Sequence, residues 1–461
     1  MNLRMAAERQ VFVPLIKALP SLSQKNVLRL IDLARWADRK NRYDLMIEAV
    51  REVYLGAKPG RELIDRILAE LSPKCREKLV LNLLINTILS RQVKDKYYRE
   101  FGIKPPFFFV ISPTMRCNLR CTGCYAGSYS KEDLPRELFE RVLLQARDMG
   151  IFFVTVSGGE PFVRNDLLEI IEKYDDMYFQ VYTNGTMIDS KLAKRLAQLG
   201  NVAPAISIEG FEKETDDRRG KGTYGRIISA MKHLRANGVF FGFSCVPTKQ
   251  TIGLLSGNRF IDCMIGKGCM FGWVFHYVPV GINPDVGLMS SPEQRTSFWD
   301  SICEIRKNKP IFIGDFWNDG LYSNGCISGG RKYFHINVKG DVEPCVFFHF
   351  AVDNIRDKPL REALNSDFFR LIREEQENIE NRFTPCLIID NPSVLRKACL
   401  ACRAMPTHKG ADVLLKNSKV RRFLDKYAEE MRDVTEYRWC QHKSIGWVRR
   451  MAEREQEKIT H

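Results

Sequence analysis

Three cysteines stand close together in the sequence, at Cys117, Cys121 and Cys124. Three thiolates in one short loop can bind three irons of a [4Fe-4S] cube, and no fourth cysteine is near enough in the sequence to bind the last iron. A metal position left open is what a catalytic site needs and a structural site lacks. The spacing therefore predicts a catalytic iron–sulfur centre. A zinc loop completed by a distant ligand is the alternative.

Short polar segments follow the cysteine loop, and each comes directly after a predicted strand. The first reads Ser157-Gly158-Gly159-Glu160-Pro161, in which glycine lets the backbone approach a ligand closely. The others are Thr183-Asn184-Gly185, Ser207–Gly210 and the arginine-rich stretch Asp217–Tyr224. Each segment alone is a common kind of turn, but their order and their places at strand ends indicate one shared binding site.

The Cys-x-x-x-Cys-x-x-Cys loop after a first strand resembles the signature of the radical S-adenosylmethionine (SAM) superfamily, and the later segments match in order. The resemblance implies that the open iron chelates the methionine amine and carboxylate of SAM. It also implies that the reduced cluster cleaves SAM to a 5′-deoxyadenosyl radical, which abstracts a hydrogen atom from an unreactive C–H bond. The protein would supply orientation and exclude competing reactions.

The same resemblance assigns residues to the cofactor. Glu160 is expected to accept from the methionine ammonium, Ser207 to contact the ribose and Arg219 to pair with the carboxylate. The backbone at Val246 is expected to meet the adenine. The full set expected to bind the cofactor is Tyr125, Gly158, Gly159, Glu160, Asn184, Ser207, Glu209, Arg219 and Val246. One departure is that Gly123 precedes the third cysteine, where many members carry an aromatic residue.

A second group of cysteines follows in the last third of the chain. Cys326, thirteen residues, Gly340, four residues and Cys345 resemble the start of a SPASM or shorter twitch domain, which holds additional iron–sulfur clusters. Cys386 and the pair Cys399-x-x-Cys402 are the other candidate ligands. We expect one auxiliary [4Fe-4S] cluster bound by about four of these five thiols. The alternative is that all five are packing or free thiols.

The elements that must position these residues alternate between strand and helix after residue 105. Such alternation predicts an α/β fold with a parallel sheet, here a partial (βα)6 barrel of the TIM type. In these barrels the chemistry collects at the carboxyl ends of the strands. The expected strands are Phe107–Ile111, Ile151–Val156, Tyr178–Tyr182, Ala203–Ile208, Phe240–Val246 and Trp273–Val278.

Pattern changes along the chain predict four regions. Residues 1–104 have apolar residues at helical spacing and form a helical region, and residues 105–309 form the barrel. Residues 310–408 form a small auxiliary Fe-S cluster domain, and residues 409–461 form a basic helical tail.

The 461 residues carry a net charge of +15, which favours an anionic partner such as nucleic acid, an acidic peptide or a membrane surface. Nucleic acid is disfavoured because no basic strip is interleaved with aromatic residues. Without a secretory signal or a stretch long enough to span a bilayer, we expect a cytoplasmic protein, with peripheral contact on the inner face of the membrane as a further possibility. The expected partner in electron transfer is a reducing electron donor such as ferredoxin or flavodoxin.

The sequence says less about the substrate. Basic helices at both ends suit binding to anionic lipid, and the layout is loosely similar to membrane-spanning lipid synthase-like members of the superfamily. This favours C–H abstraction on lipid acyl or alkyl chains, leading to C–C coupling of lipid tails. The alternative is a maturase that modifies a ribosomally made peptide or protein, although the strands of a leader-peptide recognition domain are not evident in the first hundred residues.

Overall fold

A sheet of nine strands forms the centre of the molecule, in the order β7-β6-β5-β4-β3-β2-β1-β8-β9. The computed structural model describes residues 58–126, 130–281 and 284–444, together with scattered residues between 26 and 55. Strands β1 to β7 pair in parallel with their neighbours. They are β1 (Phe108–Ile111), β2 (Phe153–Val156), β3 (Tyr178–Thr183), β4 (Val202–Ser207), β5 (Gly242–Cys245), β6 (Phe271–Val274) and β7 (Phe312–Asp315).

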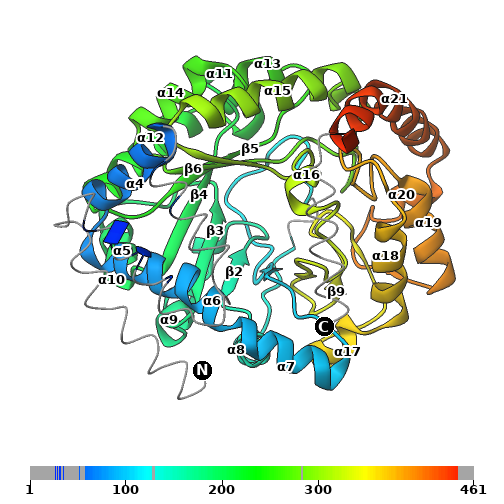
Figure 1. Cartoon of the computed structure of the whole chain (residues 1–461), viewed down its shortest axis with the longest axis horizontal. Coiled ribbons are helices and arrows are strands. Elements are labelled where there is room, and N and C mark those ends of the chain that lie inside the picture. Colours follow the sequence, from blue (N-terminus) through cyan, green and yellow to red (C-terminus); the bar gives the residue numbers. More distant parts are fainter. Residues whose placement is uncertain are drawn as a thin grey trace.

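Helices between the strands cover the outside of the sheet (Figure 1). They are α8 (Arg136–Asp148), α9 (Leu167–Lys173), α10 (Ser190–Leu199), α11 (Glu212–Arg219), α12 (Thr223–Ala236), α13 (Ile252–Leu255), α14 (Asn258–Gly266) and α15 (Pro292–Asn308), with short 3-10 turns η3 (Pro161–Val163) and η4 (Val286–Leu288). Local sequence sets their ends. For example, Asp189 accepts from the Leu192 N–H at the start of α10, and Gly200 ends that helix in the left-handed conformation.

Successive side chains of the strands face opposite sides, as the pleat requires. Val154 and Val181 are fully buried in the main hydrophobic core, which packs strands against helices. Their neighbours Thr155, Gln180 and Tyr182 line an internal cavity instead. The barrel therefore has a closed outer face and an inner face that is available for binding.

The expected α/β fold is confirmed, and all six expected strands are present with ends shifted by a few residues. The sheet also continues beyond residue 309, because β7 pairs in parallel with β6. The boundary expected there falls between α15 and β7. The run Ile311-Phe312-Ile313 is so short that its sequence pattern did not distinguish it from the aromatic strands of the next region.

Helices also form the described part of the amino-terminal region: α4 (Lys58–Glu70), α5 (Pro73–Lys78), the π-helix η2 (Leu79–Ile85), α6 (Asn86–Leu89) and α7 (Arg91–Phe101). Leu71, Cys75 and Leu79 share a hydrophobic cluster with Tyr178 and Phe271, which are the first residues of β3 and β6. These helices therefore pack at the end of the sheet opposite the cysteine loop.

The carboxyl-terminal third joins the barrel sheet. Strand β8 (His335–Ile336) pairs in parallel with β1, and β9 (Val342–Glu343) pairs antiparallel with β8. The remaining elements are α16 (Gly320–Ser323), β10 (Phe350–Ala351), α17 (Leu360–Leu364), α18 (Asp367–Glu377), α19 (Pro392–Ala401), β11 (Met405–Pro406), α20 (Val413–Lys416) and α21 (Ser418–Ser444). The end of the expected basic tail, residues 445–461, lies outside the described residues.

None of the described helices is both long enough and apolar enough to cross a bilayer.

Candidate active site

The loop that carries Cys117, Cys121 and Cys124 follows β1, and all three cysteines line the central cavity. Burial raises the pKa of the Cys117 thiol, and the nearby thiols of Cys121 and Cys124 raise it further. The backbone N–H of Leu119 donates to the Cys117 sulfur at 3.4 Å. The three expected cluster ligands are thus gathered at the carboxyl end of the barrel.

In the described part of the chain, no three His, Cys, Asp or Glu side chains are close enough to hold a single metal ion. A [4Fe-4S] cube binds each cysteine through a different iron, so its ligands stand wider apart than those of a tetrahedral zinc.

The cysteine loop is tied to α11 by reciprocal contacts. The Thr122 N–H donates to the Arg218 carbonyl at 3.0 Å, and the Arg218 Nε donates back to the Thr122 carbonyl at 3.2 Å. Sequence reasoning assigned no role to Arg218. These bonds fix the loop against the helix that also carries Arg219.

Gly158 and Gly159 allow a close approach, but what approaches them is another segment of the protein backbone and not the ligand that we expected. A Cβ on Gly158 would lie 2.3 Å from the Thr114 carbonyl oxygen, and a Cβ on Gly159 would lie 2.2 Å from that of Arg116. The Gly159 N–H also donates to the Thr114 carbonyl at 2.9 Å. Both glycines line the cavity. A larger residue would not fit at either position, because the segment that leads into Cys117 lies too close.

Glu160 is fully buried and is held by donors from the next strand. Its carboxylate accepts from the Thr183 hydroxyl at 2.8 Å and from the Asn184 N–H at 2.7 Å. Burial raises the pKa of the Glu160 carboxyl to about 7, although these hydrogen bonds act in the opposite direction. The Asn184 amide itself lies 4.0 Å from the Cys117 sulfur. Glu160 and Asn184 therefore form one polar group beside the cysteine loop.

Glu209 joins three parts of the site. Its carboxylate accepts from Arg219 Nε at 2.9 Å and from the Val246 N–H at 3.0 Å, and Arg218 Nη1 lies 2.7 Å away. The nearby arginines keep the pKa of this carboxyl below its ordinary value, against the larger opposing effect of burial. Arg219 Nη1 in turn lies 4.0 Å from the Cys121 sulfur. Glu209 thus orients Arg219 at the cysteines.

Two further expected residues complete this end of the cavity. The Ser207 hydroxyl is 3.2 Å from that of Ser244, which extends the polar surface onto β5. The Tyr125 hydroxyl is 2.5 Å from that of Ser157, and its ring centroid lies 5.0 Å from that of Phe347 in the carboxyl-terminal third. Sequence reasoning missed Ser244 and Phe347, because they become neighbours of the site only through the sheet order.

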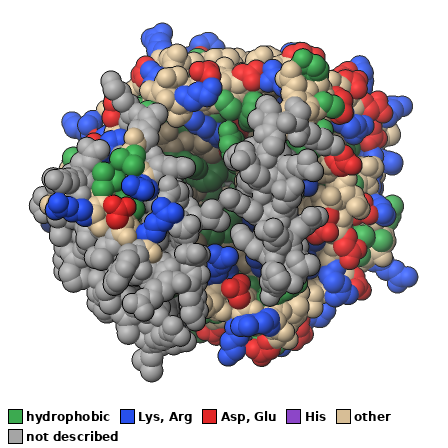
Figure 2. Space-filling model, in the orientation of Figure 1, with side chains coloured by type: hydrophobic (Ala, Val, Ile, Leu, Met, Phe, Trp, Pro, Cys, Tyr) green, Lys and Arg blue, Asp and Glu red, His purple; other side chains and the backbone are tan. Residues whose placement is uncertain are grey.

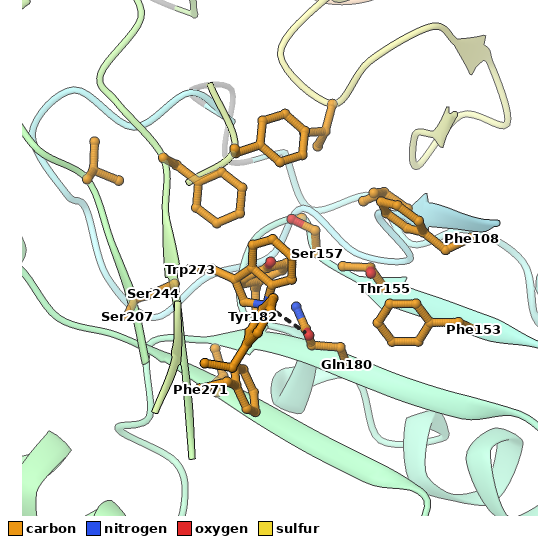
Figure 3. A pocket seen from close by; sticks show the side chains of 18 of the residues that line it. Phe108, Phe153, Thr155, Ser157, Gln180, Tyr182, Ser207, Ser244, Phe271 and Trp273 are labelled. Carbon is orange, nitrogen blue, oxygen red and sulfur yellow. Dashed lines mark hydrogen bonds between the residues drawn. The ribbon is translucent and has the colours of Figure 1, made fainter. Parts of the chain in front are cut away.

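The cavity has a volume of about 960 Å³ and extends from the cysteine loop to the amino-terminal helices. Figure 3 shows Phe153, Tyr182 and Trp273 pointing into it, and the face in Figure 2 is hollowed over hydrophobic side chains. Beyond the polar end its walls are almost entirely apolar. These walls include Leu63, Ile67, Leu79, Leu83, Leu84, Ile88, Phe107, Phe108, Phe153, Phe240, Met270, Phe271, Trp273, Phe275, Phe312, Phe316, Val346 and Phe347.

Trp273 is fixed within this wall. Its indole N–H donates to the Gln180 side chain at 3.1 Å, which is the dashed line in Figure 3. On the other side, a Cβ on Gly314 would lie 2.4 Å from the indole ring. The absence of a side chain at Gly314 therefore lets the ring rest against β7.

A second, small pocket gathers Cys326, Cys345 and Cys386 with the side chains of Trp317 and Tyr333. Burial raises the pKa of the Cys345 thiol to about 12, and the neighbouring Cys326 contributes in the same direction. Burial also raises the pKa of the Cys386 thiol, and Cys326 contributes in the same direction. Three of the five expected auxiliary ligands are therefore brought together.

Cys399 and Cys402 do not line this pocket. They lie at the end of α19, where the pKa of the Cys399 thiol is raised by burial and then by the adjacent Cys402. The Cys399-x-x-Cys402 spacing spans the last turn of this helix, and the pocket gathers the other three of the five expected thiols.

Comparisons with known proteins agree with this geometry. Residues 111–254 match the model of the radical SAM superfamily, and residues 326–388 match that of the SPASM iron–sulfur cluster-binding domain. The mycofactocin maturase MftC of Mycolicibacterium smegmatis is 29% identical over 300 residues, covering 60% of this chain and 75% of that protein. The PqqA peptide cyclase of Rhizobium meliloti is 27% identical over 283 residues, covering 56% and 73%. The structure of Streptococcus suis SuiB bound to precursor peptide SuiA has a TM-score of 0.52 and 21% identity, covering 61% and 69%.

Proposed function

Because this chain is a radical SAM enzyme with a SPASM domain, we propose that it abstracts a hydrogen atom from an apolar part of a substrate bound in the barrel cavity. Its cofactors are SAM and the [4Fe-4S] cluster that binds SAM. The SPASM domain provides auxiliary iron–sulfur binding. When bound and reduced, the first cluster supplies the electron that converts SAM to methionine and a 5′-deoxyadenosyl radical.

The chain's own residues would bind and orient these groups. Cys117, Cys121 and Cys124 would hold the cluster. Arg219, oriented by Glu209, would pair with the SAM carboxylate, since a guanidinium matches a carboxylate in two parallel hydrogen bonds. Gly158, Gly159 and Asn184 would shape the methionine end, and Tyr125, Ser207 and Val246 the remaining contacts.

Glu160 would accept from the methionine ammonium. The donors that hold it come from Thr183 and Asn184, at the end of the neighbouring strand. Its carboxylate is therefore in a fixed position before SAM binds, which lowers the cost of ordering the contact.

The single observation that carries the proposal is the continuity of the cavity. The cysteine loop, with Cys117, Cys121 and Cys124, lines the same cavity as the apolar walls around Phe153 and Phe271. A radical formed at the loop would meet a substrate carbon between largely apolar walls, which limits side reactions with water.

The comparisons support a peptide or protein substrate, the alternative in our sequence analysis, more than a lipid. One relative is named a peptide cyclase, and SuiB is a structure with a bound precursor peptide. We therefore propose first that the substrate is a peptide whose apolar or aromatic side chain enters the cavity.

A second candidate is a lipid acyl or alkyl chain, with coupling of lipid tails as the reaction and peripheral membrane contact as its setting. The cavity supports this candidate, because its volume of about 960 Å³ is at the upper end for small-molecule sites and its walls beyond the polar end are almost entirely apolar. The relatives do not support it.

Deletion of the gene in its host, with complementation by the wild type or by the Cys121→Ala variant, distinguishes the two. The first candidate predicts that the peptide profile changes, that only the wild type restores it and that the lipid extract is unchanged. A lipid change that only the wild type restores would favour the second. If neither profile depends on Cys121, both substrates are wrong.

A further inference from the structure

Tyr333 makes a direct contact with one of the three thiols of the second pocket. Its hydroxyl donates to the Cys345 sulfur at 2.8 Å, and both residues are buried. The strand register explains the contact. Strand β8 pairs antiparallel with β9 as His335 with Glu343, and two more residues in each direction place Tyr333 opposite Cys345.

The pocket has the features that an iron–sulfur cluster requires of its surroundings. Backbone N–H groups point at two of its sulfurs: Phe347 donates to Cys345 at 3.5 Å, and Ile388 donates to Cys386 at 3.4 Å. Each donor is two residues after its cysteine, as Leu119 is after Cys117 in the first site. Such N–H···S bonds stabilise thiolates at a cluster.

Trp317 gives a second sign that the pocket receives a group with acceptors. The residue is among those that line the pocket and is 2% exposed, yet its buried indole N–H has no hydrogen-bond partner within the structure as described. Buried donors are rarely left unpaired, so a bound group with acceptor atoms would satisfy this N–H.

Tyr333 is prevented from turning away by two aromatic neighbours. Its ring is stacked on Phe108 with centroids 5.1 Å apart and planes 5° apart. Phe316 meets it edge-on at 5.7 Å. Both neighbours also line the substrate cavity. These ring contacts hold the hydroxyl beside Cys345.

We propose that Tyr333 is a positioning residue for the auxiliary cluster, and that its hydrogen bond to Cys345 raises the reduction potential of that cluster. Reduction adds negative charge to the cluster and its thiolates. A donor fixed at the sulfur therefore stabilises the reduced form more than the oxidised form. The proposal rests on Cys345 being a cluster ligand.

The test is a redox titration of the auxiliary cluster, followed by electron paramagnetic resonance. Full-length, anaerobically reconstituted protein carries Cys117→Ala, Cys121→Ala and Cys124→Ala, so that the first cluster contributes no signal. Adding Tyr333→Phe should leave the iron content unchanged and move the midpoint potential to a more negative value. Tyr437→Phe is the matched control, because Tyr437 is 73% exposed on α21 and should leave the potential unchanged.

An unchanged potential with full iron content would overturn the proposal. If Tyr333→Phe loses iron, electron–nuclear double resonance on the protein with Tyr333 intact decides instead. An exchangeable proton strongly coupled to the reduced cluster supports the hydrogen bond, and its absence contradicts it. If the Cys345→Ala variant keeps its full iron content, Cys345 is not a cluster ligand. That outcome contradicts the ligand assignment on which the proposal rests.

Discussion

Glu209 accepts a hydrogen bond from Arg219 Nε at 2.9 Å, and the same guanidinium lies 4.0 Å from the Cys121 sulfur. The carboxylate also accepts from the Val246 N–H at 3.0 Å, so one buried side chain links β4, α11 and β5. The position of Arg219 relative to the cysteine loop therefore depends on a residue that need not touch the cofactor.

Replacing Glu209 with glutamine tests this dependence. The Glu209→Gln variant leaves two arginines without their counter-charge, so the guanidinium of Arg219 loses its fixed orientation. We expect SAM affinity to fall by about tenfold or more, on the scale of losses when a supporting partner is removed. The measurement is equilibrium binding of SAM to the reconstituted protein. The control is Asp217→Asn, whose exposed pair with Lys213 should contribute little.

The pKa of Glu160 predicts a pH dependence of SAM binding. Because burial raises this pKa to about 7, the carboxyl is neutral below pH 7 and negative above it. An ammonium group binds the negative form, so affinity for SAM should rise with pH from 6 to 8, by up to about tenfold per unit below the pKa. The Glu160→Gln variant should lack this rise, while any titration of SAM itself occurs in both proteins. Equal pH profiles would contradict the role of Glu160.

A substitution at Gly314 should obstruct the cavity without changing any residue that is expected to bind the cofactor. A Cβ at this position would lie 2.4 Å from the Trp273 ring, so Gly314→Ala should push the indole into the cavity. We expect less modified product for each 5′-deoxyadenosine formed, because SAM cleavage continues while the substrate is displaced. The control is Gly225→Ala, where a Cβ meets nothing within 4 Å. Unchanged coupling in both variants would mean that the substrate does not occupy this space.

Iron content separates the grouped auxiliary thiols from the pair on α19. Two four-iron clusters give about eight irons per chain. The Cys386→Ala variant should fall toward about four, because this thiol lies with Cys326 and Cys345 in one pocket. Cys402→Ala should keep about eight, since Cys402 is outside that pocket. Loss of iron in the second variant and not in the first would reverse the assignment.

Much of this arrangement could be anticipated from local patterns. The strands of the barrel appear as short buried runs between helical segments, and the cysteine spacings are visible directly. The placement of Glu160 follows from a segment at a strand end, whereas Arg219 lies at the end of α11 and not at the strand end expected for its segment. What these segments do depends on contacts between distant residues. For example, only glycine fits at position 158, because the Thr114 carbonyl lies too close for a Cβ. No local sequence pattern reveals this contact.

The remaining differences have the same origin. The Cys399-x-x-Cys402 spacing suits a metal ligand pair and a helix turn equally, and only the fold shows which sulfurs share a pocket. The apolar cavity could not be anticipated either. Its walls combine Leu83 of the amino-terminal helices with Phe271 and Phe316, whose proximity is created by sheet order and helix packing.

The most direct measurement is SAM cleavage by the anaerobically reconstituted protein with a strong reductant. Cys121 lines the cavity with Cys117 and Cys124, so the wild type should form 5′-deoxyadenosine and methionine, and Cys121→Ala should form neither. Full turnover in the Cys121→Ala variant, or none in a wild type that carries its clusters, would contradict the account.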